Sequence, residues 1–205
     1  MGDQQQPQQQ PVPRPVPEPT PHPGPEGDLT PTLVGRLRAG DSAAGELMER
    51  LYRRDLTRFC AGYLGAVEQA EDAVQDVFCK VLAAETVPDS FRAWIYRIAR
   101  NRCLDLLRGR ARRRDDQSLP SENPVADELT GQLTRLVRKE LHSRLRQIVA
   151  GLPASQREIL RLRYVEGLSR QEIAGVLEIP ESIVKSRLFE GLERLRQHTS
   201  LMSSD

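Results

Sequence analysis

The chain has 205 residues, 38% of them apolar and 4% aromatic, enough for one ordinary domain or two small ones with aliphatic cores. Its 30 basic and 29 acidic residues nearly cancel, which would argue against a nucleic-acid partner if the charges were evenly spread. No stretch approaches the roughly 18 apolar residues of a membrane-spanning helix, and the start lacks the basic and apolar regions of a signal peptide. We therefore expect a cytoplasmic protein with no membrane partner.

The first 28 residues differ in composition from the rest of the chain. They contain nine of the fifteen prolines and the near-continuous glutamine run QQQPQQQ. So few apolar side chains cannot offset the entropy that is lost when a chain becomes ordered. We predict a disordered tail over residues 1–28, which would act either as a docking arm or as a spacer.

Helical periodicity begins at Leu29, and its clearest part is AEDAVQDVFCKVL. Apolar residues recur there at three- and four-residue steps, which predicts a helix with one buried stripe: Ala70, Ala73, Val74, Val77, Phe78 and Val81. Residues 66–90 carry six acidic residues and one lysine. The exposed face of this helix is therefore expected to be acidic.

A loop over residues 85–90 separates the acidic helix from a basic one. Residues 91–114 hold nine arginines and one acid, Asp105. At about 100° per residue the apolar side chains fall on one side of the helix. The other side carries Arg97, Arg100, Asn101 and Arg108. Arginine contacts phosphates, whereas an asparagine amide can both donate to a base and accept from it, so this face predicts DNA binding. A merely solvated charged face is the alternative.

Between Gly109 and Glu128 the helical periodicity stops. The prolines and polar residues of DDQSLPSENPVADE predict a linker over residues 111–127. Helical periodicity then resumes, so the flanking ranges 29–110 and 128–205 are predicted to be two small helical domains. No strand-like alternation occurs in the sequence, and the expected fold class is all-α.

The second domain contains the pattern of a helix-turn-helix. Ser155 with Glu158, and Ser169 with Glu172, have the spacing of capping boxes and predict two helix starts. A third helix follows the turn at EIPE, and the exposed residues at its start are expected at the major groove: Glu181, Ser182, Lys185, Ser186 and Arg187. A plain helical hairpin is the alternative, because residues 151–197 are nearly neutral.

The sequence offers no reactive constellation. Cys60, Cys79 and Cys103 lack the paired spacing of a zinc site, and we interpret them as small core residues in a reducing compartment. An enzyme with Cys79 or Cys103 as nucleophile would need a histidine partner, but the three histidines lie outside the first helical domain. We expect no catalytic activity, no cofactor and no metal.

Two of these motifs together resemble a known family. AEDAVQDVFCKVL with FRAWIYRIARNRCLDLLR resembles region two of the extracytoplasmic-function group of bacterial sigma factors. LPASQREILRLRYVEGLSRQEIAGVLEIPESIVKSRLFEGLERLR resembles region four. The two motifs occur in the right order across a linker, within residues 38–197. The resemblance implies two all-α domains that bind core RNA polymerase, recognise the two promoter elements and direct promoter-specific initiation.

The resemblance also assigns roles to residues. It implies that the acidic helix docks on the clamp helices of the polymerase's largest subunit through Asp72, Gln75, Asp76 and Phe78. The polymerase flap region would be a second contact. The loop and the basic helix would bind the minus-ten element through Val87, Ser90, Trp94, Arg97, Arg100, Asn101 and Arg108. Phe78 and Trp94 also fit plain core positions. The helix-turn-helix would bind the minus-thirty-five element, and an anti-sigma factor is a further candidate partner that the sequence leaves open.

Four positions depart from the family pattern. Glu178 stands where relatives usually have glycine, at a turn that favours a positive φ. SIVKSR replaces the common GTVKSR, and Glu190 occupies a position that is commonly arginine. These changes leave the upstream DNA contacts and the promoter sequence open. The main rival function is a helix-turn-helix regulator that binds symmetric half-sites as a dimer, without polymerase.

Overall fold

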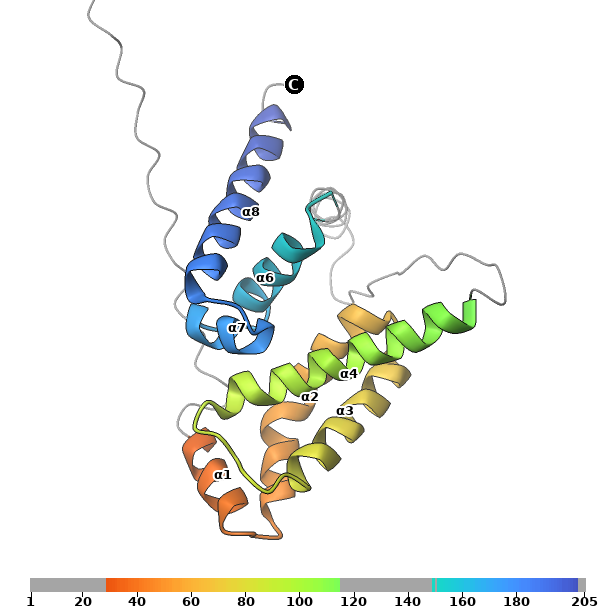
Figure 1. Ribbon diagram of the computed structural model, residues 1–205, viewed down its shortest axis with the longest axis vertical. Coiled ribbons are helices and arrows are strands. Elements are labelled where there is room, and N and C mark those ends of the chain that lie inside the picture. The colour runs from red at the N-terminus through yellow and green to blue at the C-terminus, as the bar shows by residue number, and fades with distance from the viewer. Residues whose placement is uncertain (1–28, 115–148, 150, 203–205) are drawn as a thin grey trace, which may run out of the picture.

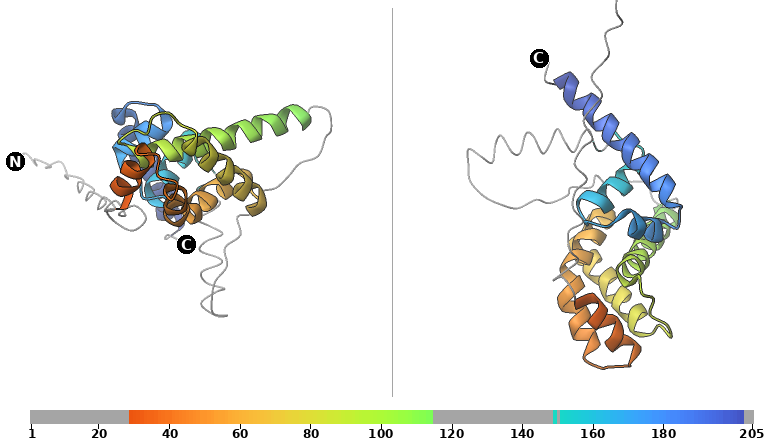
Figure 2. Two further views of the ribbon diagram at one scale, coloured as in Figure 1. Left: turned by 90° about the horizontal axis from the view of Figure 1, so that it is seen from below. Right: turned by 90° about the vertical axis from the view of Figure 1, so that its left-hand side faces the viewer.

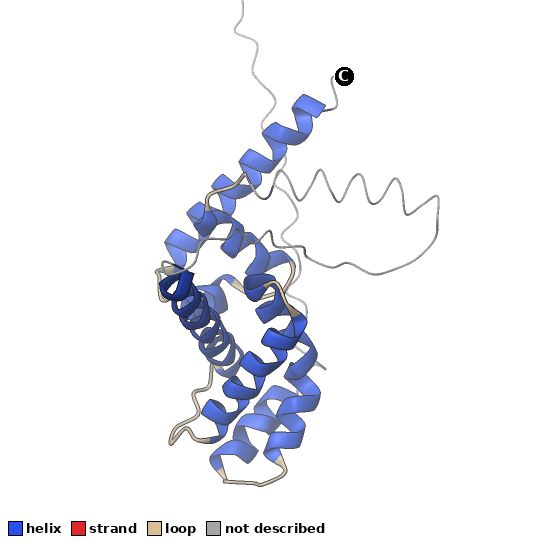
Figure 3. Ribbon diagram, turned by 90° about the vertical axis from the view of Figure 1, so that its right-hand side faces the viewer, coloured by secondary structure: helices blue, strands red, loops and turns tan. Residues whose placement is uncertain are grey.

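The computed structural model describes residues 29–114, 149 and 151–202. These residues form seven helices, arranged in two units that pack against each other (Figure 1). No strand lies among them, so the expected all-α fold is confirmed over the described ranges (Figure 3). Within the same ranges, no helix is long and apolar enough to cross a membrane. The predicted tail, most of the predicted linker and the helical pattern that follows it lie outside the described residues.

The first unit consists of four helices: α1 (Leu29–Arg38), α2 (Ala44–Leu64), α3 (Val67–Leu82) and α4 (Phe91–Arg114). Helices α2, α3 and α4 pack pairwise around a shared core. Two edge-to-face aromatic pairs join α2 to α4, Tyr52 with Phe91 at 5.5 Å and Phe59 with Tyr96 at 5.1 Å between ring centroids. Such pairs stabilise beyond the area they bury, so they fix α4 on the unit that carries it.

Helix α3 confirms the apolar pattern of the sequence. Its buried residues are the six of the predicted stripe: Ala70, Ala73, Val74, Val77, Phe78 and Val81. Helix α4, in contrast, continues through Arg114, beyond the predicted domain end at residue 110. Arginine and alanine are strong helix formers, so the helix propagates into solvent after its apolar stripe has ended.

The second unit contains α6 (Ala154–Tyr164), α7 (Arg170–Leu177) and α8 (Glu181–Met202). The capping box at the start of α7 is confirmed, because Ser169 Oγ accepts from the Glu172 amide and the Glu172 carboxylate accepts from the Ser169 amide. The capping box predicted from Ser155 and Glu158 is wrong. Helix α6 begins at Ala154 with Pro153 as its N-cap, so Ser155 lies inside the first turn and does not cap it, and the Glu158 carboxylate bonds to Arg100 of the first unit.

The turn between α7 and α8 places Glu178 at φ 55° and ψ 43°. Among the described residues it is the only one other than glycine with a positive φ. The strain expected from a side chain at this turn is therefore present, on the order of 1 kcal/mol. It persists because α7 and α8 are held on both sides of the turn.

The two units are in direct contact, and the views of Figure 2 place the second unit against the beginning of α4, whose C-terminal half extends away from it. Small residues permit the close approach. A Cβ added at Gly175 of α7 would lie 3.3 Å from the Ala93 Cβ of α4. A Cβ at Gly62 of α2 would overlap the guanidinium of Arg161 from α6. We call this contact between residues 29–114 and 151–202 the closed arrangement.

Candidate nucleic-acid interface

Helix α4 separates its side chains into two faces. Ile95, Tyr96, Ala99 and Cys103 are buried in the first unit. Asn101 and Arg108 are exposed, and Arg97 and Arg100 are half-buried. This agrees with the two-faced helix expected from the sequence, except that two of the predicted phosphate-binding arginines are partly covered.

The cover comes from carboxylates of the second unit. Arg100 donates to both oxygens of Glu158 in α6, at 2.7 and 3.2 Å. Arg97 donates to the Glu178 carboxylate at 3.2 Å. Hydrogen bonding to Glu158 raises the pKa of Arg100 above its ordinary value. In the closed arrangement these arginines are therefore bonded to carboxylates at the places where phosphates were expected.

The remaining residues predicted for the minus-ten element lie around the start of α4. The Ser90 carbonyl accepts from the Trp94 amide at 3.0 Å, so Ser90 lies directly at the start of the helix. Trp94 is half-buried, with its ring edge-to-face on Phe91 at 5.8 Å. Val87 is buried, and its carbonyl accepts from the Arg38 guanidinium. Its backbone is thus tied into the fold, and its side chain offers little surface to a ligand.

The predicted upstream face lies on the first turns of α8. Ser182, Lys185 and Ser186 are exposed, Arg187 is half-buried, and Glu181 forms an ion pair with Arg170 at 3.6 Å. The same side of the helix carries Phe189, whose exposed fraction is 67%. Phe189 was not among the predicted site residues. Its position next to the buried Leu188, off the apolar stripe, was the sequence signal that could have found it.

The acidic residues of α3 are only partly available. Asp72 and Gln75 are exposed, whereas the Asp76 carboxylate accepts from Arg102 of α4 at 2.7 Å. Phe78 is 2% exposed and lies in the core, with the Arg53 guanidinium 5.5 Å from its ring centroid. Phe78 therefore occupies the plain core position that the sequence also allowed.

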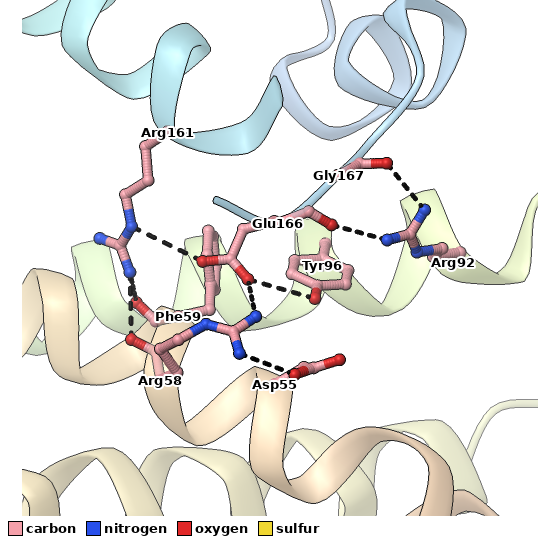
Figure 4. Close-up of polar contacts among 8 residues, drawn as sticks. All are labelled: Asp55, Arg58, Phe59, Arg92, Tyr96, Arg161, Glu166 and Gly167. Atoms are coloured by element: carbon pink, nitrogen blue, oxygen red, sulfur yellow. Dashed lines mark hydrogen bonds and ion pairs between the residues drawn. The ribbon is translucent and has the colours of Figure 1, made fainter. Parts of the chain in front are cut away.

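A buried carboxylate at the centre of the interface was not predicted. The Glu166 side chain, from the loop after α6, has an exposed fraction of 0% and lies between the two units (Figure 4). It accepts from Arg58 of α2 at 2.9 Å and from the Tyr96 hydroxyl at 3.5 Å. Arg92 of α4 donates to the carbonyls of Glu166 and Gly167 at 2.6 and 3.3 Å.

Arg161 completes this cluster from the side of the second unit. Its guanidinium lies 3.8 Å from the Glu166 carboxylate, bonds to the Phe59 carbonyl and stacks 5.1 Å from the Phe59 ring centroid. Burial raises the pKa of Glu166, and the attraction of Arg58 and Arg161 offsets only part of that rise. The cluster therefore joins the units by an ionic contact that is costly to desolvate.

The cysteines divide between core and surface. Cys60 and Cys103 are buried, as expected of small core residues, but Cys79 is exposed. No group of His, Cys, Asp and Glu side chains in the described ranges has an arrangement that could hold a metal ion.

Comparisons with known proteins match both units. Residues 48–113 match the family described as Sigma-70 region 2, and residues 142–195 match Sigma-70, region 4. The ECF RNA polymerase sigma-E factor of Escherichia coli K12 is 31% identical over 176 residues, which cover 80% of this chain and 90% of that protein. The ECF RNA polymerase sigma factor SigW of Bacillus subtilis is 29% identical over 177 residues, with 80% and 93% covered.

A solved structure shares the fold. CnrH, determined in complex with the cytosolic domain of CnrY, matches with a TM-score of 0.57 at 22% identity, over 85% of this chain and 97% of that chain. Both family regions occur in order, and named relatives are similar over 80% of this chain. The chain belongs to the ECF family of RNA polymerase sigma factors, which bind core polymerase and direct transcription initiation at promoters.

Proposed function

We propose that three surfaces of the chain each bind a different partner during initiation. The loop and the exposed face of α4 bind the minus-ten element, the first turns of α8 bind the minus-thirty-five element, and the acidic face of α3 docks on the clamp helices of core polymerase. The observation that carries the proposal is the two-faced helix α4. Its apolar side is locked in the core, and its outward side presents Arg97, Arg100, Asn101 and Arg108.

Arginines on this face would hold the phosphate backbone, and Asn101 would contact a base. A single strand that leaves its partner needs a basic track for its phosphates and an aromatic surface for its bases. Trp94, half-buried at the border of the face, supplies such a surface next to the loop.

Binding at α4 requires the closed arrangement to open. Arg97 and Arg100 cannot keep Glu178 and Glu158 as partners and also neutralise promoter phosphates. The second unit must therefore move away from α4 when the minus-ten element binds. We propose that core polymerase stabilises this open state by holding the two units apart.

The docking face would use Asp72 and Gln75 directly, with Phe78 supporting α3 from inside the core. Asp76 would exchange its bond to Arg102 for a bond to the polymerase. CnrH forms a complex with the cytosolic domain of CnrY. By analogy, an anti-sigma factor that binds this chain outside the holoenzyme is part of the proposal. The chain would act in the cytoplasm through binding alone, without catalysis.

Run-off transcription with the cognate core polymerase on a genomic promoter library tests the proposal. We expect transcripts from a defined promoter set only when the chain is added, and loss of these transcripts with Asp76→Arg at unchanged helix content. A dimer that binds symmetric DNA sites without polymerase, and gives no promoter-specific transcripts, would instead establish the rival regulator.

A further inference from the structure

Two exposed residues of α8 are joined to the buried interior of the second unit. The Glu190 carboxylate accepts from the Ser186 hydroxyl through Oε1 and from the Gln156 amide through Oε2, each at 2.9 Å. Ser186 lies one turn before Glu190, on the side of α8 that faces solvent. Two consecutive hydrogen bonds, Gln156 to Glu190 and Ser186 to Glu190, thus connect α6 with the outer face of α8.

Gln156 fixes the position of Glu190. It is only 4% exposed, and Gly191 lets α8 approach so closely that an added Cβ there would lie 3.0 Å from Leu160 and 3.6 Å from the Gln156 Cβ. An ionised carboxylate can only accept, so the amide nitrogen of Gln156, not its oxygen, must face it. One oxygen of Glu190 is therefore held by a buried donor, and the other remains for Ser186.

The bond to Glu190 determines what Ser186 can offer to a ligand. A serine hydroxyl has one proton and two lone pairs, and the proton points to the carboxylate. Only the lone pairs remain on the outward side. The free lone pairs of Glu190 are likewise acceptors, so this part of the α8 surface accepts hydrogen bonds and donates none through these two side chains.

We propose that Ser186, oriented by Glu190, selects a base with an exocyclic amino group at one position of the minus-thirty-five element. This inference rests on the proposed function of α8. In the major groove adenine presents its N6 amino group and cytosine its N4 amino group, both donors. Guanine O6 and thymine O4 are acceptors and would face another acceptor. The pair therefore discriminates adenine and cytosine from guanine and thymine on the strand it contacts.

The test is transcription by holoenzyme with the full chain over all single-base variants of the minus-thirty-five element. We expect the wild type to prefer adenine or cytosine by about fivefold at the position that responds to Ser186→Ala, the size of one net hydrogen bond. Glu190→Gln keeps the shape of the side chain but changes its chemistry. The new amide must turn its oxygen to Gln156 and its nitrogen to Ser186, which frees the serine proton.

Glu190→Gln should therefore admit guanine or thymine at that position, and Glu190→Ala should remove the discrimination. Glu193→Gln is the matched control, because Glu193 lies on the same helix and contacts Arg196 at 3.7 Å. It should leave the profile unchanged. Because Glu190→Gln is isosteric, it remains informative if Glu190→Ala lowers stability.

The outcomes separate the two proposals. If neither Ser186→Ala nor Lys185→Ala changes any upstream preference, the assignment of α8 to the minus-thirty-five element fails, and the inference fails with it. If Ser186→Ala changes one position but both Glu190 variants keep the wild-type profile there, only the inference is overturned. A wild-type preference for guanine or thymine at that position also overturns it.

Discussion

The two helices proposed to contact promoter DNA, α4 and α8, differ in what their outward residues touch. Arg97 and Arg100 of α4 are bonded to Glu178 and Glu158 of the second unit. Ser182, Lys185 and Ser186 of α8 are exposed to solvent. The same closed arrangement thus covers one proposed recognition face and leaves the other accessible. The difference indicates an order of events, in which the upstream element can be contacted before the units separate and the minus-ten element only afterwards.

Arg97 and Arg100 are covered by ionic contacts, although α4 and α7 also pack closely at Ala93 and Gly175. Glu158 accepts from both Arg100 and the Tyr63 hydroxyl, so one carboxylate holds side chains of α4 and α2. Charge-assisted hydrogen bonds of this kind are worth about 1.5–3 kcal/mol each when well shielded. If α4 binds the minus-ten element as proposed, promoter phosphates would replace the carboxylates as partners of the arginines, whereas an apolar cover would have no such replacement.

The largest effect is expected from Glu158→Arg, which places a second cation beside Arg100. Breaking this partly buried pair should cost the closed arrangement on the order of 3 kcal/mol, or about 100-fold in its equilibrium with an open form. Small-angle scattering of the free chain should show a larger radius of gyration. Glu193→Arg, a charge reversal outside the interface, is the control. An unchanged scattering curve for Glu158→Arg would refute the role of this pair in closure.

Arg100→Ala tests whether Arg100 contacts a promoter phosphate in the holoenzyme. In the holoenzyme, loss of one phosphate contact should weaken promoter binding about equally across sequences and lower the salt slope by about one unit. Arg36→Ala removes an arginine of α1 that is paired with Asp41, outside the proposed surfaces, and it should leave the slope unchanged. A slope equal to that of the wild type for Arg100→Ala would show that Arg100 serves only the closed arrangement.

Asn101→Ala should act on base preference instead. Asn101 is exposed on the same face, and its amide can both donate and accept. We expect a change of about fivefold in preference at one minus-ten position, with little change in overall affinity. Transcription over all single-base variants of the minus-ten element measures it. A uniform loss, or none, would remove Asn101 from the reading site.

The smallest expected effect is a dependence of closure on pH through Glu166. Burial raises the pKa of this carboxyl in the closed arrangement, whereas in an open form it would be near its ordinary value. As the pH falls from 7 towards 5, the closed arrangement takes up a proton that the open form does not, so the closed fraction should increase. Scattering against pH measures this, and Glu166→Gln should abolish the dependence. A closed fraction that falls on acidification would contradict it.

Much of the fold was predictable because it depends on local patterns. The stripe of α3 follows from three- and four-residue spacing, and the cap at Ser169 follows from residue types at a fixed offset. The strained turn at Glu178 was expected only from the family resemblance, because relatives usually have glycine there. The end of α4 was misplaced, because the apolar pattern stops before the helix does. Periodicity reports which residues are buried, and an exposed helix end leaves no such signal.

The state of the candidate site was less predictable, because it depends on contacts between distant residues. Glu158 had the spacing of a cap, yet it bonds to Arg100 of another unit. Glu166 is a charged loop residue, a type that is almost always exposed, but it is buried here because Arg58 and Arg161 meet it. Such ion pairs form only when the two units pack together. The residues next to Glu158 and Glu166 in the sequence therefore do not predict them.

The most direct test locks the closed arrangement with a disulfide. The Cβ positions of Ala93 and Gly175 would lie 3.3 Å apart, so a shift of a few tenths of an ångström brings them into the range of about 3.5–4.5 Å that disulfides require. The variant Ala93→Cys with Gly175→Cys, in a Cys79→Ser background, is assayed in run-off transcription when oxidised and after reduction, with Ala93→Cys alone as control. We predict no promoter-specific transcript from the oxidised form and recovery after reduction. Equal transcription from the oxidised and reduced forms would contradict the claim that the units must separate for α4 to bind DNA.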